Sequence, residues 1–150
     1  MSKQWSAFAL AACLGFPGAS WAMSCSISSL PIGDMGVYFP DIDITRQYAI
    51  FLTCTSGGAI ASLSAGPSQN TGSIENRRMK HDSRSDTLRY QLCLDGACST
   101  IFGNSGNQIG TIMITDQNQG RFSFWVKVFG GQPLVAAGTY RDTVTITLSP

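Results

Sequence analysis

The only histidine of the chain, His81, lies in the segment KHDSRSD beside Asp82 and Ser83. Histidine, aspartate and serine form the catalytic relay of serine hydrolases, in which each group hydrogen-bonds the next. Three direct neighbours in a polar loop cannot form that relay, and no serine lies in a nucleophile-elbow motif. The histidine also has no partners at the spacing of metal ligands. We therefore expect His81 to lie in a solvated loop, and we expect no enzyme, no metal and no cofactor.

The acidic residues do not suggest catalysis either. Asp41 and Asp43 lie in one short acidic turn, and Glu75 is the only glutamate, so no carboxylate pair for glycoside hydrolysis is indicated. The whole chain is almost neutral, with Lys plus Arg 10 against Asp plus Glu 9. A neutral chain has no long-range attraction for phosphate backbones, so we expect no nucleic-acid partner.

One basic stretch is a candidate surface-binding site for an anionic polysaccharide or for lipid headgroups. Its members are Arg77, Arg78, Lys80 and Arg84, with His81 and Arg89 close to them. Glu75, Asp82 and Asp86 are interleaved with these cations, which makes a solvated loop the alternative interpretation.

The first 22 residues predict a signal peptide. Lys3 gives a positive start, WSAFALAACLGF is a short apolar core, and ASWA supplies small residues before a cleavage site after Ala22. The apolar run is too short to span a bilayer, so we expect no membrane span. LAAC also matches a lipoprotein site that would lipidate Cys13, but the apolar run continues past it. Removing Lys3 leaves nine charges of each sign in the mature chain, residues 23–150.

An exported chain reaches an oxidising environment, in which cysteines are expected to form disulfides. The mature chain keeps Cys25, Cys54, Cys93 and Cys98. An even count in an exported chain predicts two disulfides, with three possible connectivities. Asp95-Gly96 indicates a type I′ turn that places Cys93 opposite Cys98, at a Cα separation of about 4.5 Å. This favours Cys93–Cys98 and leaves Cys25–Cys54, whereas a zinc site would lack a CxxC pair.

Alternating apolar residues predict an antiparallel two-sheet sandwich that forms a single domain. The segments expected to be extended are 24–30, 35–40, 46–55, 59–66, 87–94, 98–103, 107–115, 121–130 and 138–150. Residues 67–86 form a polar stretch between two of them. Trp125 and Phe129 lie on the second face of their strand, where they form an exposed patch unless another sheet covers them.

The closing segment GTYRDTVTITLSP is the most strand-like in the chain. Val144, Ile146 and Leu148 point one way and the intervening threonines point the other. Only Arg141 and Asp142 place charge on it, although exposed strand edges are normally protected. We expect another part of the chain, or another polypeptide, to cover this edge.

The order of motifs resembles the spore coat protein U-like family, which includes the subunits of archaic, Csu-type chaperone–usher pili. The motifs are Cys25 near the mature start, MGVYFP, LTCTSG, SLSAG, RRM, LRYQLCLD, IFG and AAGTYRDTVTITL. They span nearly the whole mature chain, and the closing AGTYRDTVTITL is the most specific of them. The pair Cys93 and Cys98 and the ending LSP depart from the family pattern.

The resemblance implies an incomplete immunoglobulin-like antiparallel sandwich that lacks its last strand. A periplasmic chaperone would lend a strand, and the N-terminal extension of a neighbouring pilin would replace it in the fibre. The expected acceptor groove runs along residues 140–148 and is lined by Tyr140, Val144, Ile146 and Leu148. An outer-membrane usher would complete the partners, and the subunit would pass through the periplasm to the cell surface or a fimbria, or be secreted, supporting adhesion and biofilm formation.

The position of the signal peptide suggests a special place in the fibre. If cleavage follows Ala22, only Met23 and Ser24 precede Cys25, whereas a donor segment needs about a dozen alternating residues. We therefore expect a tip or terminal subunit that accepts a strand and donates none, or a partner that does not polymerise. The alternative is a secreted, self-contained coat or matrix sandwich, whose own chain fills the groove.

Overall fold

The computed structural model describes residues 23–29, 34–132 and 135–150. The expected signal peptide, with Cys13, lies outside the described residues.

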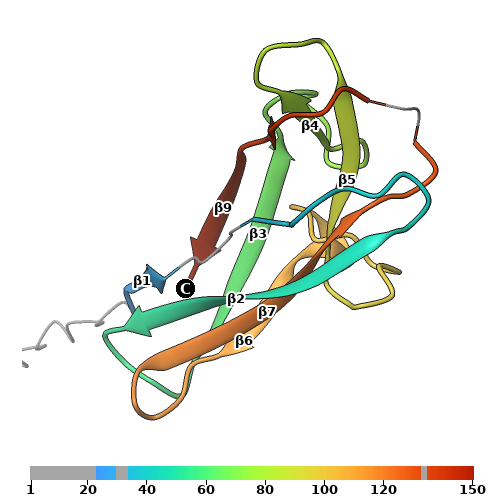
Figure 1. Cartoon of the computed structure of the whole chain (residues 1–150). Coiled ribbons are helices and arrows are strands. Elements are labelled where there is room, and N and C mark those ends of the chain that lie inside the picture. The colour runs from blue at the N-terminus through green and yellow to red at the C-terminus, as the bar shows by residue number, and fades with distance from the viewer. Residues whose placement is uncertain (1–22, 30–33, 133–134) are drawn as a thin grey trace, which may run out of the picture.

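The described chain forms two antiparallel sheets that pack as a sandwich, as the sequence predicted (Figure 1). The six-stranded sheet has the order β1-β2-β7-β5-β4-β8, and the three-stranded sheet has the order β6-β3-β9. The strands are β1 (Cys25–Ser29), β2 (Ile44–Cys54), β3 (Ile60–Ser68), β4 (Arg78–His81), β5 (Thr87–Cys93), β6 (Gly110–Met113), β7 (Gln119–Val128), β8 (Tyr140–Arg141) and β9 (Val144–Ser149). A single short 3-10 helix, η1 (Gly106–Gln108), is the helical element of the described residues.

The core lies between the sheets and follows from the alternation of β2 and β7. These strands pair over most of their length, with Ile50 opposite Phe122 and Tyr48 opposite Phe124. Apolar residues of both strands turn to the same side, because side chains in a strand alternate between its two faces. Phe102 enters the core from the loop after β5, and its ring lies 5.2 Å from that of Phe122.

Three predicted elements differ from the structure. Residues 35–40 form no strand, because Gly36 adopts φ +87° and its N–H bonds the carboxylate of Asp34 in a local turn. Residues 98–103 form only one bridge, between Ile101 and Cys93. Conversely, the polar stretch 67–86 contains β4, which is held by pairing with β5 and β8 on its two sides.

Both expected disulfides, Cys25–Cys54 and Cys93–Cys98, are present. The predicted two-residue hairpin at Asp95-Gly96 is wrong, because Cys93 pairs with Ile101 and Cys98 takes a left-handed φ of 60°. The carboxylate of Asp95 accepts bonds from the N–H groups of Ser99 and Thr100, at 3.0 and 2.8 Å. These bonds stabilise a wider loop, residues 94–100, in place of a continued ladder.

The outer face of β7, for which the sequence left open an exposed patch or cover by another sheet, is covered by this loop and by side chains. The indole of Trp125 lies directly against Gly96 of the loop. The guanidinium of Arg89 lies 4.4 Å from the centre of the Phe129 ring. Both aromatic residues are therefore half-buried and form no exposed patch.

Candidate functional site: a groove beside the last strand

One edge of β9 is paired and the other is open. β3 pairs with β9 so that Leu63 faces Leu148 and Ala65 faces Ile146. No described strand pairs with the second edge of β9, which ends the three-stranded sheet. Leu63 and Ala65 are both 0% exposed, whereas Ile146 and Leu148 are only half-buried. The apolar face of β9 is therefore incompletely covered within the described chain.

The chain changes sheets just before β9. Tyr140 and Arg141 of β8 pair with β4, and Val144 begins the pairing with β3. Asp142 lies at this crossing and accepts a hydrogen bond of 2.6 Å from the hydroxyl of Tyr90. Burial, and then this bond to the carboxylate, raise the pKa of Tyr90 well above its usual range. The hydrogen bond between Tyr90 and Asp142 thus fixes the point where the chain leaves the large sheet and begins β9 in the small one.

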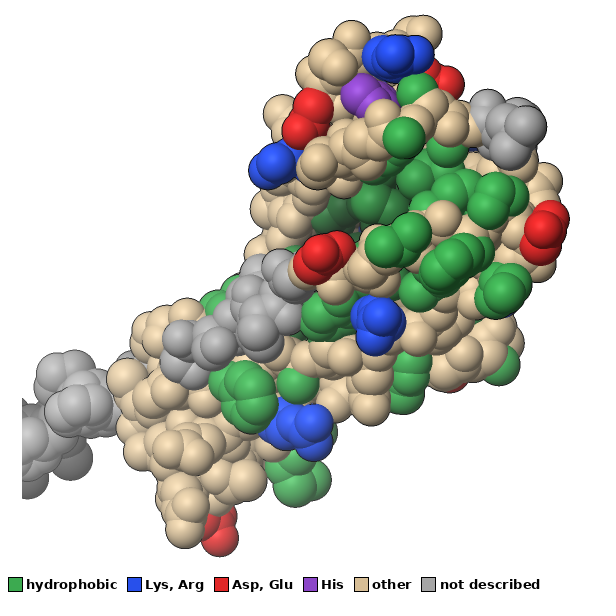
Figure 2. All heavy atoms as spheres, in the orientation of Figure 1, with side chains coloured by type: hydrophobic (Ala, Val, Ile, Leu, Met, Phe, Trp, Pro, Cys, Tyr) green, Lys and Arg blue, Asp and Glu red, His purple; other side chains and the backbone are tan. Residues whose placement is uncertain are grey.

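A groove of about 1130 Å³ opens at this separation. Its floor includes Leu92 of β5 and Val126 and Val128 of β7, which belong to the core face of the large sheet. Residues 34–38 and 135–139 form further walls. Figure 2 shows hydrophobic side chains gathered around a hollow on this face of the molecule. The volume exceeds that of ordinary small-molecule sites, which favours an extended segment as the occupant.

The structure brings three of the four expected groove residues together. Tyr140, Val144 and Ile146 line the groove, whereas Leu148 lies further along β9 and is not among the lining residues. The segment 34–38 and the floor residues were not expected there. The alternation of the floor residues marks them as core residues, and no sequence signal shows that this part of the core stays accessible from outside.

His81 corrects a sequence expectation, because it is buried and does not lie in a solvated loop. Its Nδ1 accepts a hydrogen bond of 3.0 Å from the N–H of Ser83, and its Nε2 lies 3.2 Å from the carbonyl oxygen of Ala137. A side chain at Gly138 would overlap the imidazole ring. The ring of Tyr140 meets it edge-on at 5.1 Å. His81 thus holds a wall of the groove in place.

The position of Arg77 contradicts the expected basic surface, because this side chain is buried. It is 0% exposed and donates hydrogen bonds to the side-chain oxygen of Gln91 and to the carbonyl oxygens of Ala65 and Gly66. The register of the β3–β9 pair shifts between Ala65 and Ser68, which interrupts the ladder of main-chain hydrogen bonds. The guanidinium donates to carbonyl oxygens at this interruption. Desolvation lowers the pKa of Arg77.

The other candidate cations stay accessible to different degrees. Arg78 is half-buried, while Lys80 and Arg84 are exposed. A surface site that depends on all four cations is therefore excluded by the burial of Arg77.

The described residues contain neither a metal-binding cluster nor a membrane-spanning helix. Those residues contain no group of three or more histidine, cysteine, aspartate or glutamate side chains that could hold a metal ion. No helix among them has the length and apolarity needed to cross a bilayer.

Comparisons with known proteins identify a family and a shared fold. The profile of the Spore Coat Protein U domain family matches residues 11–147. A chain of the CsuC–CsuE chaperone–tip adhesion subunit pre-assembly complex, from archaic chaperone-usher Csu pili of Acinetobacter baumannii, is 23% identical with a TM-score of 0.58. The match covers 85% of this chain and 40% of that chain, and at this identity it shows a shared fold.

A second solved structure is a chaperone–tip adhesin complex described as vital for activation of CFA/I fimbriae biogenesis. It is 15% identical with a TM-score of 0.48, over 85% of this chain and 41% of that one. The chain thus spans about two fifths of the length of the structures that it matches. No curated protein matches its sequence.

Proposed function

The chain belongs to the Spore Coat Protein U domain family, and from that premise we propose that it is a structural or adhesive subunit of a chaperone–usher pilus. Its fold would be completed by a strand from another polypeptide. The observation that carries the proposal is the apolar groove beside the unpaired edge of β9.

An inserted strand would both pair with the open edge of β9 and cover the apolar side chains that line the groove. Its main chain would pair with the open edge of β9, which supplies affinity without regard to sequence. Alternate apolar side chains would enter the groove and cover Val144 and Ile146. Each fully buried aliphatic side chain contributes about 1.5–3 kcal/mol, so a few such contacts would stabilise the subunit strongly.

The proposed partners follow from this mode of assembly. A periplasmic chaperone would occupy the groove first, a neighbouring pilin would replace it, and an outer-membrane usher would secrete the growing fibre. The fold shared with a chaperone–tip adhesion subunit complex supports the chaperone partner. A strand-accepting tip or terminal position, with a role in adhesion and biofilm formation, is the finer part of the proposal. Export would begin with the signal peptide at residues 1–22.

A variant with an appended strand tests the proposal. A flexible Gly/Ser/Asn loop followed by about ten residues of alternating valine and threonine is added after Pro150. We expect a monomer whose melting temperature is at least about 10 °C above that of the unextended protein. The matched control carries aspartate at each valine position and should gain nothing.

Equal stability of the two extended proteins would contradict the proposal. It would instead favour a self-contained secreted coat or matrix sandwich. That alternative also predicts that the unextended protein stays monomeric when expressed without a chaperone, whereas an incomplete sandwich aggregates or is degraded.

A further inference from the structure

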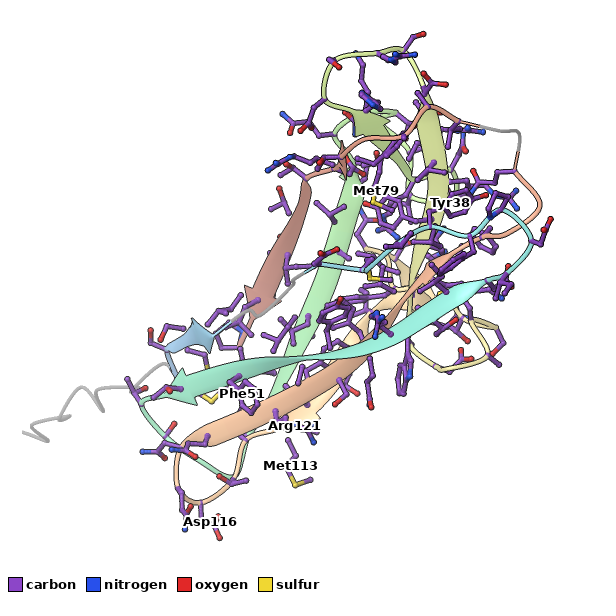
Figure 3. All side chains as sticks on the ribbon, in the orientation of Figure 1. Tyr38, Phe51, Met79, Met113, Asp116 and Arg121 are labelled. Carbon is purple, nitrogen blue, oxygen red and sulfur yellow. A yellow bond between two sulfur atoms is a disulfide. The ribbon has the colours of Figure 1, made fainter. Side chains whose placement is uncertain are left out.

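Two methionines line the groove. Met35 lies in one wall of it, and Met79 lies in β4. Both side chains are half-buried and pack against the hydrophobic core. The other methionines of the mature chain, Met23 and Met113, are not among the lining residues. Figure 3 shows Met113 at the other end of the molecule, pointing away from it, whereas Met79 lies at the groove.

The thioether of Met35 is held in place by β2. The hydroxyl of Tyr48 donates a hydrogen bond to Sδ of Met35 at 3.2 Å, and Nε of Arg46 donates to the carbonyl oxygen of Met35 at 3.0 Å. Tyr48 is not among the residues that line the groove, so Met35 separates its hydroxyl from the groove. A thioether sulfur has two lone pairs, and the hydroxyl leaves one of them free to react.

Methionines in this position link the polarity of the groove to their oxidation state. Hydrogen peroxide transfers one oxygen atom to a thioether: an S–O bond forms, the O–O bond breaks, sulfur loses two electrons and water is released. The apolar side chain thereby becomes a polar sulfoxide. Under an inserted apolar strand, the sulfoxide oxygen would lose its contact with water without gaining a hydrogen bond. Oxidation should therefore oppose strand insertion.

We propose that Met35 and Met79 are oxidation sites for hydroperoxides that enter the open groove, and that their sulfoxides prevent the insertion of an apolar strand. The inference rests on the proposed function and adds a chemical condition to it, because only a subunit with reduced groove methionines accepts a strand. Since a periplasmic chaperone is proposed to fill the groove first, the strand to which this condition applies is that of the chaperone.

The first test measures whether a bound strand protects the two sulfur atoms. The full mature chain is treated with hydrogen peroxide, and sulfoxides are assigned by mass spectrometry of its peptides. A synthetic peptide of about ten alternating valine and threonine residues represents the chaperone strand. With this peptide bound, Met35 and Met79 should oxidise at least about fivefold more slowly than without it. Met113 is the internal control, because it is 72% exposed outside the groove, and its rate should not change.

The second test measures how oxidation changes affinity for the same peptide with a terminal fluorophore. Peroxide treatment of the unsubstituted protein should lower the affinity at least about tenfold. The double variant Met35→Leu with Met79→Leu keeps nearly the same side-chain volume and forms no sulfoxide in the groove, so its affinity should change less than about threefold on treatment. Met113→Leu is the matched control and should lose affinity as the unsubstituted protein does.

Three results would overturn the inference. Met35 and Met79 could resist peroxide while Met113 reacts, or oxidise equally fast with and without the peptide. The double variant could lose as much affinity as the unsubstituted protein, which would place the sensitive group elsewhere. Circular dichroism could show that the treated protein has lost its strand content, in which case oxidation unfolds the subunit and does not act on the groove.

Failure of the inference and failure of the proposed function give different results. If the untreated protein binds the peptide and keeps its affinity after both groove methionines are oxidised, the inference is wrong and the function stands. If the untreated protein neither binds the peptide nor gains stability from an appended strand, the proposed function fails and the inference falls with it.

Discussion

Arg77 carries a positive charge into the interior, where its hydrogen-bond partners are carbonyl and amide oxygens. The sequence RRM gives no reason to distinguish Arg77 from Arg78, since both are arginines in a polar stretch. The difference arises from strand alternation together with a bulge in β3, which is a feature of tertiary structure. A residue-level prediction of a basic surface therefore failed where a long-range contact decided burial.

Replacing Arg77 tests this buried network. Arg77→Ala removes the guanidinium that donates to the side-chain oxygen of Gln91 and to the carbonyl oxygens of Ala65 and Gly66, so we expect a loss of at least about 3 kcal/mol in the free energy of unfolding. Urea denaturation of the protein with the appended strand provides the measurement. Arg78→Ala is the matched control and should cost less than about 1 kcal/mol, because Arg78 is only half-buried. Similar losses for both variants would refute the assigned role.

At the scale of elements, the alternation of apolar and polar residues was enough to predict the long strands but not the short ones. β2, β7 and β9 carry regular apolar patterns and lie close to where the sequence placed them. β4 has the sequence RMKH and is extended only because β5 and β8 lie on its two sides. The loop 94–100 could not be predicted from Asp95-Gly96, because the side chain of Asp95 competes with the turn for backbone donors.

The stability of the loop 94–100 should depend on pH. Hydrogen bonds from the backbone of Ser99 and Thr100 lower the pKa of Asp95. A carboxyl group with a lowered pKa in the folded state contributes stability at neutral pH, and this contribution is lost as pH falls through the folded pKa, below about 4.

Asp95→Asn should therefore narrow the difference in melting temperature between pH 7 and pH 3, as measured by circular dichroism. Ser99→Ala removes only the side-chain donor and should narrow it less. A pH dependence that Asp95→Asn leaves unchanged would show that the loop bonds do not favour the ionised carboxylate.

At the scale of the whole molecule, the two sheets are unequal and the groove lies where the smaller one stops. The closing alternation made the exposed edge of β9 predictable from the sequence. The resemblance implied a groove beside this strand, but the floor and the other walls of that groove were not predictable, because they come from β5, β7 and residues 34–38, which meet only in the folded chain. An open edge beside apolar side chains also favours unspecific association. The same feature would therefore permit assembly and make the free subunit depend on a chaperone.

Two substitutions on opposite faces of β9 separate groove binding from general strand stability. Ile146 faces the groove and Thr147 is exposed on the other face. Ile146→Asp places a carboxylate where an inserted apolar side chain would be buried, so we expect affinity for the alternating peptide to fall at least about a hundredfold. Thr147→Asp adds the same charge to the same strand and should change affinity less than about threefold.

Fluorescence anisotropy measures the affinity, and circular dichroism confirms that both variants keep their strand content. Equal losses in the two variants would mean that charge anywhere on β9 disturbs the strand itself. Retained affinity in Ile146→Asp would mean that the peptide binds elsewhere. Only a loss of affinity confined to Ile146→Asp fits a strand that completes the sandwich. Positions 146 and 147 are equally close to the open edge of β9, but only the side chain on the groove face would be covered by the inserted strand.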